Sequence, residues 1–184
     1  MALMINNKKE SREYIVRHNL NRTPEIFINH DDFEKARAFL EKNYATLYVI
    51  RDADHSSAPY YYFDTFEKCK EKMALYKGQI IIAVSVNSYK NKILLGAIEI
   101  KGNSIRFCAT TDSTQDHRTM YENPKYNFVK QMDDGIWNEI PGFDEIYCYI
   151  YNHHLLDYTV EFTVYDRPVG TNSETVLINE VRNY

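Results

Sequence analysis

Two segments near the end of the chain decide the fold: residues 159–166, TVEFTVYD, and residues 175–182, TVLINEVR. Both are rich in β-branched residues, and apolar and polar side chains alternate along the first, which predicts two strands. The residues between them, RPVGTNSE, are mostly turn formers, so the strands are expected to pair as a hairpin. Because alternate residues of a strand face opposite sides, Val160, Phe162 and Val164 are expected to face the core.

The second strand of this hairpin contains a carboxylate in an unusual position. Regular alternation places Glu180 on the same face as the apolar Ile178, and burying an unpaired carboxylate is costly. Glu161 and Glu180 could meet across the ladder and share a divalent cation, since hard oxygen ligands suit Mg²⁺. The alternative is that Glu180 reaches solvent, or pairs with Arg182 or Arg51.

The rest of the chain shows helices and strands that alternate early and antiparallel pairs that dominate later, which indicates an α+β layered domain. We expect residues 1–22 to form a polar tail or short helix and residues 23–184 to form a single domain. The expected helices are 32–43, one after Asp64, and 143–156; the expected strands are 26–28, 46–51, 79–86 and a hairpin over 93–110.

Composition excludes several classes of protein. The 184 residues are 44% hydrophobic and 26% charged, as in ordinary globular domains, and no apolar run is long enough to cross a membrane. The N-terminal segment has no signal-peptide pattern, so we expect a cytoplasmic protein without membrane contact. The three cysteines are widely spaced and show no zinc pattern.

Charge is distributed unevenly along the chain. The net charge of −4 combines +4 over residues 1–130, with 20 basic and 16 acidic residues, and −8 over residues 131–184, with 2 and 10. The acidic part could hold a divalent cation or face a basic partner, although an acidic solvated surface is the ordinary interpretation. A net negative charge argues against a nucleic-acid partner, because phosphate binding needs clustered cations.

A second candidate site follows the strand expected at 46–51. Arg51 ends this strand, and Ser56 and Ser57 lie in the turn-rich segment after it. A guanidinium offers a planar fork of donors and the serines add hydroxyls, so the group could bind phosphate. Such an arginine more commonly makes a structural salt bridge.

A third candidate lies in the polar stretch 110–127, which has no clean periodicity and is expected to be a functional or mobile loop. Asp116, His117 and Arg118 combine a carboxylate, an imidazole and a guanidinium, and histidine is the usual general base near neutral pH. No nucleophile motif accompanies them, and a solvated loop is the alternative interpretation.

A resemblance to a known family rests on several short motifs. The closing hairpin, with LDYTVEFTVYD and VLINEVRN, is similar to the last strands of the nucleotide-binding domain of phosphoenolpyruvate synthase and pyruvate phosphate dikinase. These enzymes belong to the ATP-grasp superfamily. VIRDADHSS resembles a family strand end that carries an arginine, and RTPEIFINHDDFEKARAFL and LLGAIEI resemble its early helix and a strand with a glycine.

The resemblance implies an ATP-grasp-like layered α+β domain, with a mostly antiparallel sheet and helices on one face. It implies a nucleotide or phosphorylated ligand bound with a divalent cation, the cofactors being ATP and Mg²⁺. Glu161 and Glu180 would hold the metal, and Arg51 and Arg182 would contact phosphates, helped by Ser56 and Ser57. If chemistry occurs, Arg51, His117 and Arg118 are the expected catalytic residues; the sequence leaves open whether it does.

A second hypothesis comes from another class of protein. The chain would be a non-catalytic accessory protein of a bacterium or phage, using its 16 tyrosines and its acidic last third as a surface for a protein partner or a second copy. The candidate charged residues would then form ion pairs without a ligand. Single-stranded nucleic-acid binding through tyrosine clusters is a third and weaker idea.

Overall fold

The computed structural model describes residues 4–5, 8–55 and 58–183. The chain divides into two compact units, one formed by residues 1–22 and 90–184 and the other by residues 23–89. The first 22 residues, expected as a tail or short helix, contain α1 (Lys8–Arg17) and group with the larger unit. Within the described residues, no helix is long and apolar enough to cross a membrane.

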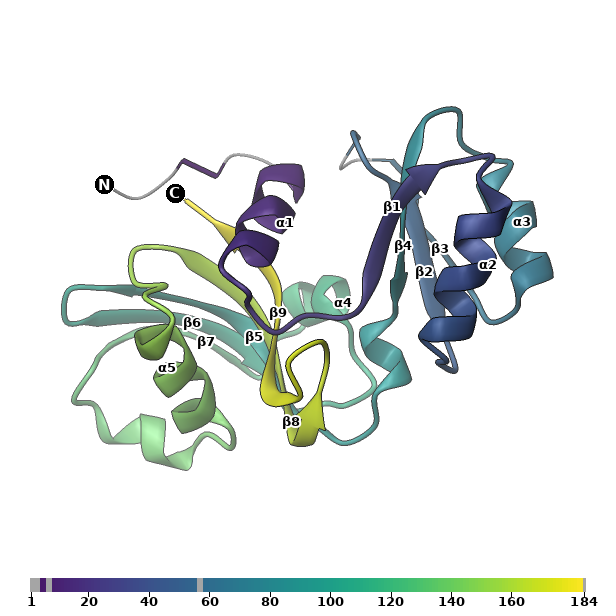
Figure 1. Cartoon of the computed structure of the whole chain (residues 1–184). Coiled ribbons are helices and arrows are strands. Elements are labelled where there is room, and N and C mark those ends of the chain that lie inside the picture. Colours follow the sequence, from purple (N-terminus) through teal and green to yellow (C-terminus); the bar gives the residue numbers. More distant parts are fainter. Residues whose placement is uncertain (1–3, 6–7, 56–57, 184) are drawn as a thin grey trace. The chain divides into compact units, whose positions relative to one another are not determined.

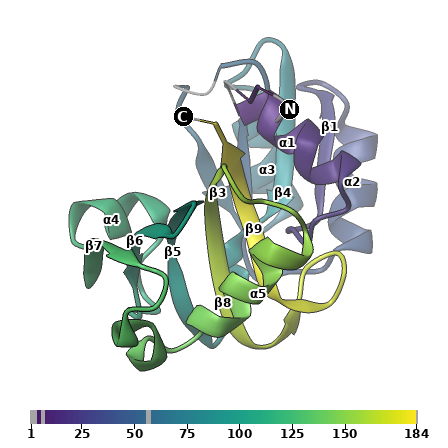
Figure 2. The ribbon, with the colours of Figure 1, turned by 90° about the vertical axis from the view of Figure 1, so that its left-hand side faces the viewer.

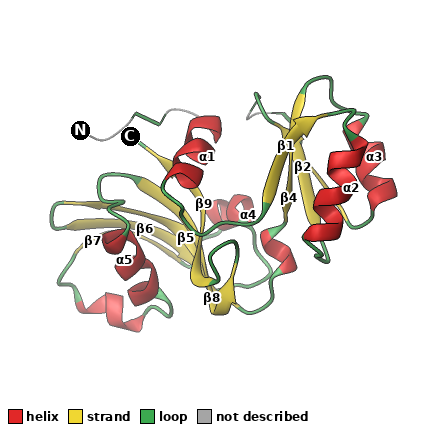
Figure 3. Ribbon diagram, in the orientation of Figure 1, coloured by secondary structure: helices red, strands yellow, loops and turns green. Residues whose placement is uncertain are grey.

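The smaller unit is a four-stranded antiparallel sheet with two helices on one of its faces (Figures 1 and 3). The strand order is β1-β4-β2-β3, so β4 is central and almost entirely buried. Its elements are β1 (Glu25–Asn29), α2 (Phe33–Lys42), β2 (Tyr48–Asp52), β3 (Tyr61–Phe63), α3 (Phe66–Met73), β4 (Gln79–Val84) and the short η1 (Val86–Ser88).

The larger unit is a five-stranded antiparallel sheet in the order β7-β6-β5-β8-β9. The helix α5 lies across the sheet near β8 (Figure 2), and residues of α1 and α5 join the same hydrophobic core. Its elements after α1 are β5 (Lys92–Lys101), β6 (Ser104–Thr110), α4 (His117–Glu122), β7 (Tyr126–Gln131), η2 (Gly135–Glu139), α5 (Phe143–Asn152), β8 (Thr159–Val169) and β9 (Glu174–Arg182).

Aromatic packing holds this core together. Phe107 of β6 stacks against Phe162 of β8 with ring centroids 6.2 Å apart and meets Trp137 and Phe143 edge to face. Val160, Phe162 and Val164 all belong to this core, which confirms the alternation expected for β8. Such aromatic pairs add to the stabilisation gained from burying their surface.

The predicted α+β fold with mostly antiparallel pairing is confirmed. The hairpin over 93–110 is present as β5 and β6, and Gly102 in its two-residue turn has the positive φ, +55°, that a turn of this kind requires. The stretch 110–127 differs from the expected loop, because Asp116 and Thr119 form a capping box that starts the short helix α4.

Candidate functional site

One face of the five-stranded sheet packs on the core, and the opposite face carries the polar candidates. Residues paired across strands lie on the same face, so the register defines transverse rows of side chains. One row runs Glu180, Glu161, Ala97, Cys108 and Asn127 across all five strands. Glu161 pairs with Glu180 across the ladder, so the two side chains lie side by side on the same face.

A β-bulge in β9 corrects the expected orientation of Glu180. Glu161 pairs with Glu180, but the next residue, Phe162, pairs with Ile178, so Asn179 is the extra residue. Asn179 contacts Thr163 on the polar face, and Ile178 and Val181 both belong to the core. The prediction that Glu180 shares the apolar face with Ile178 is therefore wrong, since the bulge interrupts regular alternation.

Arg182 lies between the two carboxylates. Its Nε donates to Glu180 Oε1 at 2.5 Å, and its Nη2 is 3.5 Å from Glu161 Oε1. The hydrogen bond to Glu180, followed by the charges of Glu180 and then Glu161, raises the pKa of Arg182 above its ordinary value despite partial burial. The Glu180–Arg182 pair was one of the sequence alternatives, and the structure extends it to Glu161.

The helix α4 contributes a hydroxyl to this group. Tyr121 donates its phenolic O–H to Glu161 Oε1 at 2.9 Å. Partial burial and the neighbouring Glu161 carboxylate raise the pKa of Tyr121, so the phenol stays protonated and remains a donor. The fully buried Met120 anchors the helix to β6, with its Sδ 3.6 Å from Cys108 Sγ.

His117, at the start of α4, lies against β8 and the bulge. Its Nε2 is 3.2 Å from the Phe162 carbonyl oxygen and 3.3 Å from Asn179 Nδ2. A neutral ring satisfies one of these contacts and not both, because Nε2 either donates to the carbonyl or accepts from the amide. Desolvation lowers the pKa of His117, and the opposing effect of Glu161 is smaller.

The structure describes the remaining candidates only in part. Arg118 lies in α4, but its side chain is outside the described residues, as are Ser56 and Ser57. Arg51 lies in β2 of the smaller unit, where Ile81 is its partner on β4. Asp52 organises the turn that follows by accepting the backbone N–H groups of Asp54 and His55, each at 2.8 Å.

The carboxylates of Glu161 and Glu180 suit a cation that has other ligands in addition to them. In the described part of the chain, no group of three or more His, Cys, Asp and Glu residues is placed to hold a metal ion. Glu161 and Glu180 supply two hard oxygen donors on facing strands, and Mg²⁺ is commonly held by one or two carboxylates together with substrate phosphates and water. The pair therefore fits magnesium bound with a phosphorylated ligand.

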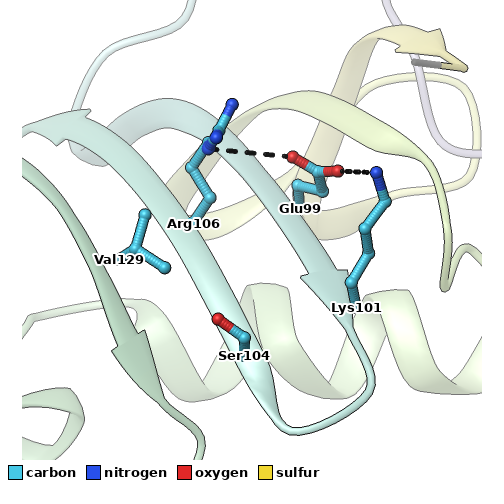
Figure 4. Close-up of a pocket in the computed structure, with 5 residues that line it drawn as sticks. All are labelled: Glu99, Lys101, Ser104, Arg106 and Val129. Carbon is cyan, nitrogen blue, oxygen red and sulfur yellow. Dashed lines mark ion pairs between the residues drawn. The ribbon is translucent and has the colours of Figure 1, made fainter.

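A pocket of about 290 Å³ lies on the β5–β7 part of the sheet and is lined by Glu99, Lys101, Ser104, Arg106 and Val129 (Figure 4). Sequence reasoning missed it, and also missed Tyr121 and Asn179. A signal existed for Glu99, whose carboxylate stands in the otherwise apolar run LLGAIEI. No comparable signal identified Tyr121, because 16 tyrosines are spread along the chain.

Comparison with solved structures finds the same fold in a group of ligases. D-alanyl-alanine synthetase A from Vibrio cholerae matches with a TM-score of 0.54 at 13% identity, covering 96% of this chain and 55% of that chain. D-alanine–D-alanine ligase from Helicobacter pylori matches with a TM-score of 0.51 at 15% identity, covering 96% and 53%. The chain thus spans about half the length of these enzymes.

No family model matches the sequence, and no curated protein matches it. At such low identity the likeness shows the fold alone, and this fold is ATP-grasp-like, as the sequence resemblance implied. The matched enzymes are ligases, and the finer resemblance to phosphoenolpyruvate synthase and pyruvate phosphate dikinase stays a prediction.

Proposed function

We propose that this protein binds a nucleotide or another phosphorylated ligand, together with a divalent cation, on the polar face of the five-stranded sheet. The observation that carries the proposal is the direct pairing of Glu161 and Glu180, side by side on the polar face. The ATP-grasp-like fold supports ATP and Mg²⁺ as the ligand and the cation.

The charge at the pair explains why a cation would bind there. Two carboxylates and the single guanidinium of Arg182 carry a formal net charge of about −1. A divalent cation held by Glu161 and Glu180 would release Arg182 from both carboxylates. The guanidinium could then turn to a phosphate, whose geometry it matches through paired N–H donors.

Other residues take supporting parts in this proposal. Tyr121 orients Glu161 through its hydrogen bond, and His117 holds α4 against β8. Should phosphoryl transfer or ligation follow binding, catalysis would rest on positioning and charge neutralisation by Arg118 and Arg182, with His117 as the candidate base. Arg51 and the neighbouring Ser56 and Ser57 belong to the other unit, and their contact with phosphate is a separate proposal.

Isothermal titration calorimetry with ATP in the presence of Mg²⁺ tests the proposal. We expect saturable binding by the wild type, and at least roughly tenfold weaker binding by Glu161→Gln and Glu180→Gln, since each variant removes a charged oxygen ligand. Chelating the cation with EDTA should weaken binding of the wild type in the same way. The matched control is Glu139→Gln, which changes an exposed glutamate of η2.

Two results would overturn the proposal: no binding by the wild type, or unchanged binding by Glu161→Gln. Arg51→Gln is titrated separately, because its failure to weaken binding would remove Arg51 alone and leave the cation site standing. Retention of the fold is checked by the fluorescence of Trp137, the single tryptophan, which is buried in the core of the larger unit.

We propose the cytoplasm as the compartment in which this protein binds its ligand.

A second function, docking of a protein partner or a second copy, has one specific observation in its favour. Tyr60 and Tyr62 form an edge-to-face pair at β3, the edge strand of the smaller sheet, and both are about 40% exposed. Aromatic side chains at a sheet edge are suited to an interface. Sedimentation velocity tests self-association, and a monomer at all concentrations would exclude a second copy.

A further inference from the structure

The pocket beside the carboxylate pair contains charges of both signs in a defined arrangement (Figure 4). Glu99 on β5 is almost buried, with 7% of its side chain exposed. Its Oε1 is 2.6 Å from Lys101 Nζ, and its Oε2 is 4.0 Å from Arg106 Nε. Each oxygen of the Glu99 carboxylate thus lies near one cation, Lys101 at Oε1 and Arg106 at Oε2.

The two cations remain open to solvent. The side chains of Lys101 and Arg106 are 56% and 62% exposed, whereas the carboxylate beneath them is covered. Two cations and one carboxylate leave the pocket with a net positive charge, although the whole protein carries −4.

The other walls of the pocket suit a small ligand. Ser104 pairs with Lys101 across the turn of the β5–β6 hairpin and adds a hydroxyl, and Val129 on β7 forms an apolar wall. The volume of about 290 Å³ has room for a small organic or inorganic anion.

We propose that the pocket lined by Glu99, Lys101, Ser104, Arg106 and Val129 binds a small anion, a phosphate or carboxylate group held between Lys101 and Arg106. Arg106 supplies a fork of donors that matches either group, Lys101 supplies a point charge, and Glu99 is a positioning residue for both. The site is distinct from the carboxylate pair and needs no divalent cation.

The register places this anion site next to the cation site. Arg182, Thr159, Glu99, Arg106 and Val129 form one transverse row, adjacent to the row that contains Glu180 and Glu161. Glu99 and Glu161 are diagonal neighbours on paired strands, a relationship that separates Cα atoms by about 7–8 Å. An anion in the pocket would therefore lie beside a ligand bound at Glu161 and Glu180.

Titration with inorganic phosphate and, separately, with acetate tests the site in the full chain without Mg²⁺. The readout is the ¹⁵N–¹H amide shifts of Gly102, Ser104 and Val129, referenced to sodium chloride at equal ionic strength. We expect saturable shifts with at least one probe, and at least roughly fivefold weaker binding in Arg106→Gln and in Lys101→Gln. Saturation by phosphate alone assigns the site to phosphate groups, and saturation by acetate alone to carboxylates.

Two variants serve as controls. Lys130→Gln removes a cation on β7 that pairs with Asp134, and it should leave phosphate and acetate binding unchanged. Glu161→Gln should not weaken it, because it removes a negative charge near the pocket, so loss of the cation site and loss of the anion site can be told apart. Absence of saturation with both probes, equal shifts with chloride, or unchanged binding in Arg106→Gln would overturn the proposal.

Discussion

Glu161 and Glu180 face one another across β8 and β9, and Arg182 contacts both of them. Two carboxylates directly opposite on a ladder repel one another, and this arrangement destabilises a sheet unless a cation lies between them. The guanidinium is the cation that the chain itself supplies. The same geometry therefore serves as a structural ion pair and as a place where Mg²⁺ could bind.

Replacing the guanidinium should reveal the repulsion. We expect Arg182→Gln to lower the free energy of unfolding by about 1–2 kcal/mol, because a charged hydrogen bond is lost and two like charges remain paired. Half of the Arg182 side chain is exposed, and solvent screening keeps the effect within this range. Urea unfolding followed by Trp137 fluorescence measures it.

The matched control for this prediction is Arg167→Gln. Arg167 pairs with its neighbour Asp166 at 3.2 Å, and both side chains are well exposed, so the change should stay within about 0.5 kcal/mol. Equal losses in the two variants would mean that the facing carboxylates do not repel one another measurably.

Much of the fold could be predicted from local sequence. β-Branched runs identified β4, β8 and β9, and the Gly102–Asn103 pair identified the β5–β6 turn, because these signals lie within a few residues. The grouping of α1 with residues 90–184 could not be predicted in this way. It depends on contacts between residues far apart in the chain, such as the hydrogen bond that the Val181 N–H donates to Ser11 Oγ.

The sequence also predicted part of the candidate site, namely the residues that a local sequence signal identifies. Glu180 was found because a carboxylate among apolar neighbours is conspicuous in a sequence, although the face expected for it was wrong, and Glu161 was found as its possible partner across the ladder. The bulge at Asn179 was not, since strand alternation gives no sign that one residue is extra until the partner strand is known. Glu99 and Lys101 lie on β5 and Arg106 lies on β6, so their meeting depends on the register of this hairpin.

The stability of the larger unit should depend on pH through His117. Because burial lowers its pKa in the folded state, the unfolded chain binds more protons in the range between that value and the ordinary value near 6.5. The contribution is fully present above about pH 6.5 and is lost as the pH falls toward the lowered pKa. Stability should therefore be greater at pH 7.5 than at pH 5.5.

A variant separates this contribution from that of other groups. His117→Gln keeps an amide donor for the Phe162 carbonyl and removes the titrating ring. We expect the difference in unfolding free energy between pH 7.5 and 5.5 to shrink, by at most about 1.4 kcal/mol per pH unit. Identical pH profiles for the variant and the wild type would show that His117 does not titrate with folding.

Loss of the capping residue at the N-terminus of α4 should lower the stability of the protein. Asp116 accepts the N–H of Thr119 at 3.0 Å, and the Thr119 hydroxyl reaches back to Asp116. Asp116→Ala removes this cap from a six-residue helix and is expected to cost about 1 kcal/mol. Asp116→Asn keeps an accepting oxygen and should lose much less. Urea unfolding of both variants checks the prediction, which fails if Asn and Ala cost the same.

Gly96 sits where β5 and β6 approach too closely for a side chain. A Cβ at this position would lie 2.6 Å from Ala109 Cβ and 2.7 Å from the Cys108 carbonyl oxygen, and the second contact is with backbone that cannot rotate away. We expect Gly96→Ala to destabilise the larger unit by about 1–3 kcal/mol, as overpacking does elsewhere. The control is Gly135→Ala, in the same unit, where nothing lies within 4 Å of the added methyl group. Urea midpoints measured by circular dichroism should fall for Gly96→Ala and stay near the wild-type value for Gly135→Ala. A tolerated Gly96→Ala would mean that β5 and β6 can separate by several tenths of an ångström without loss of pairing.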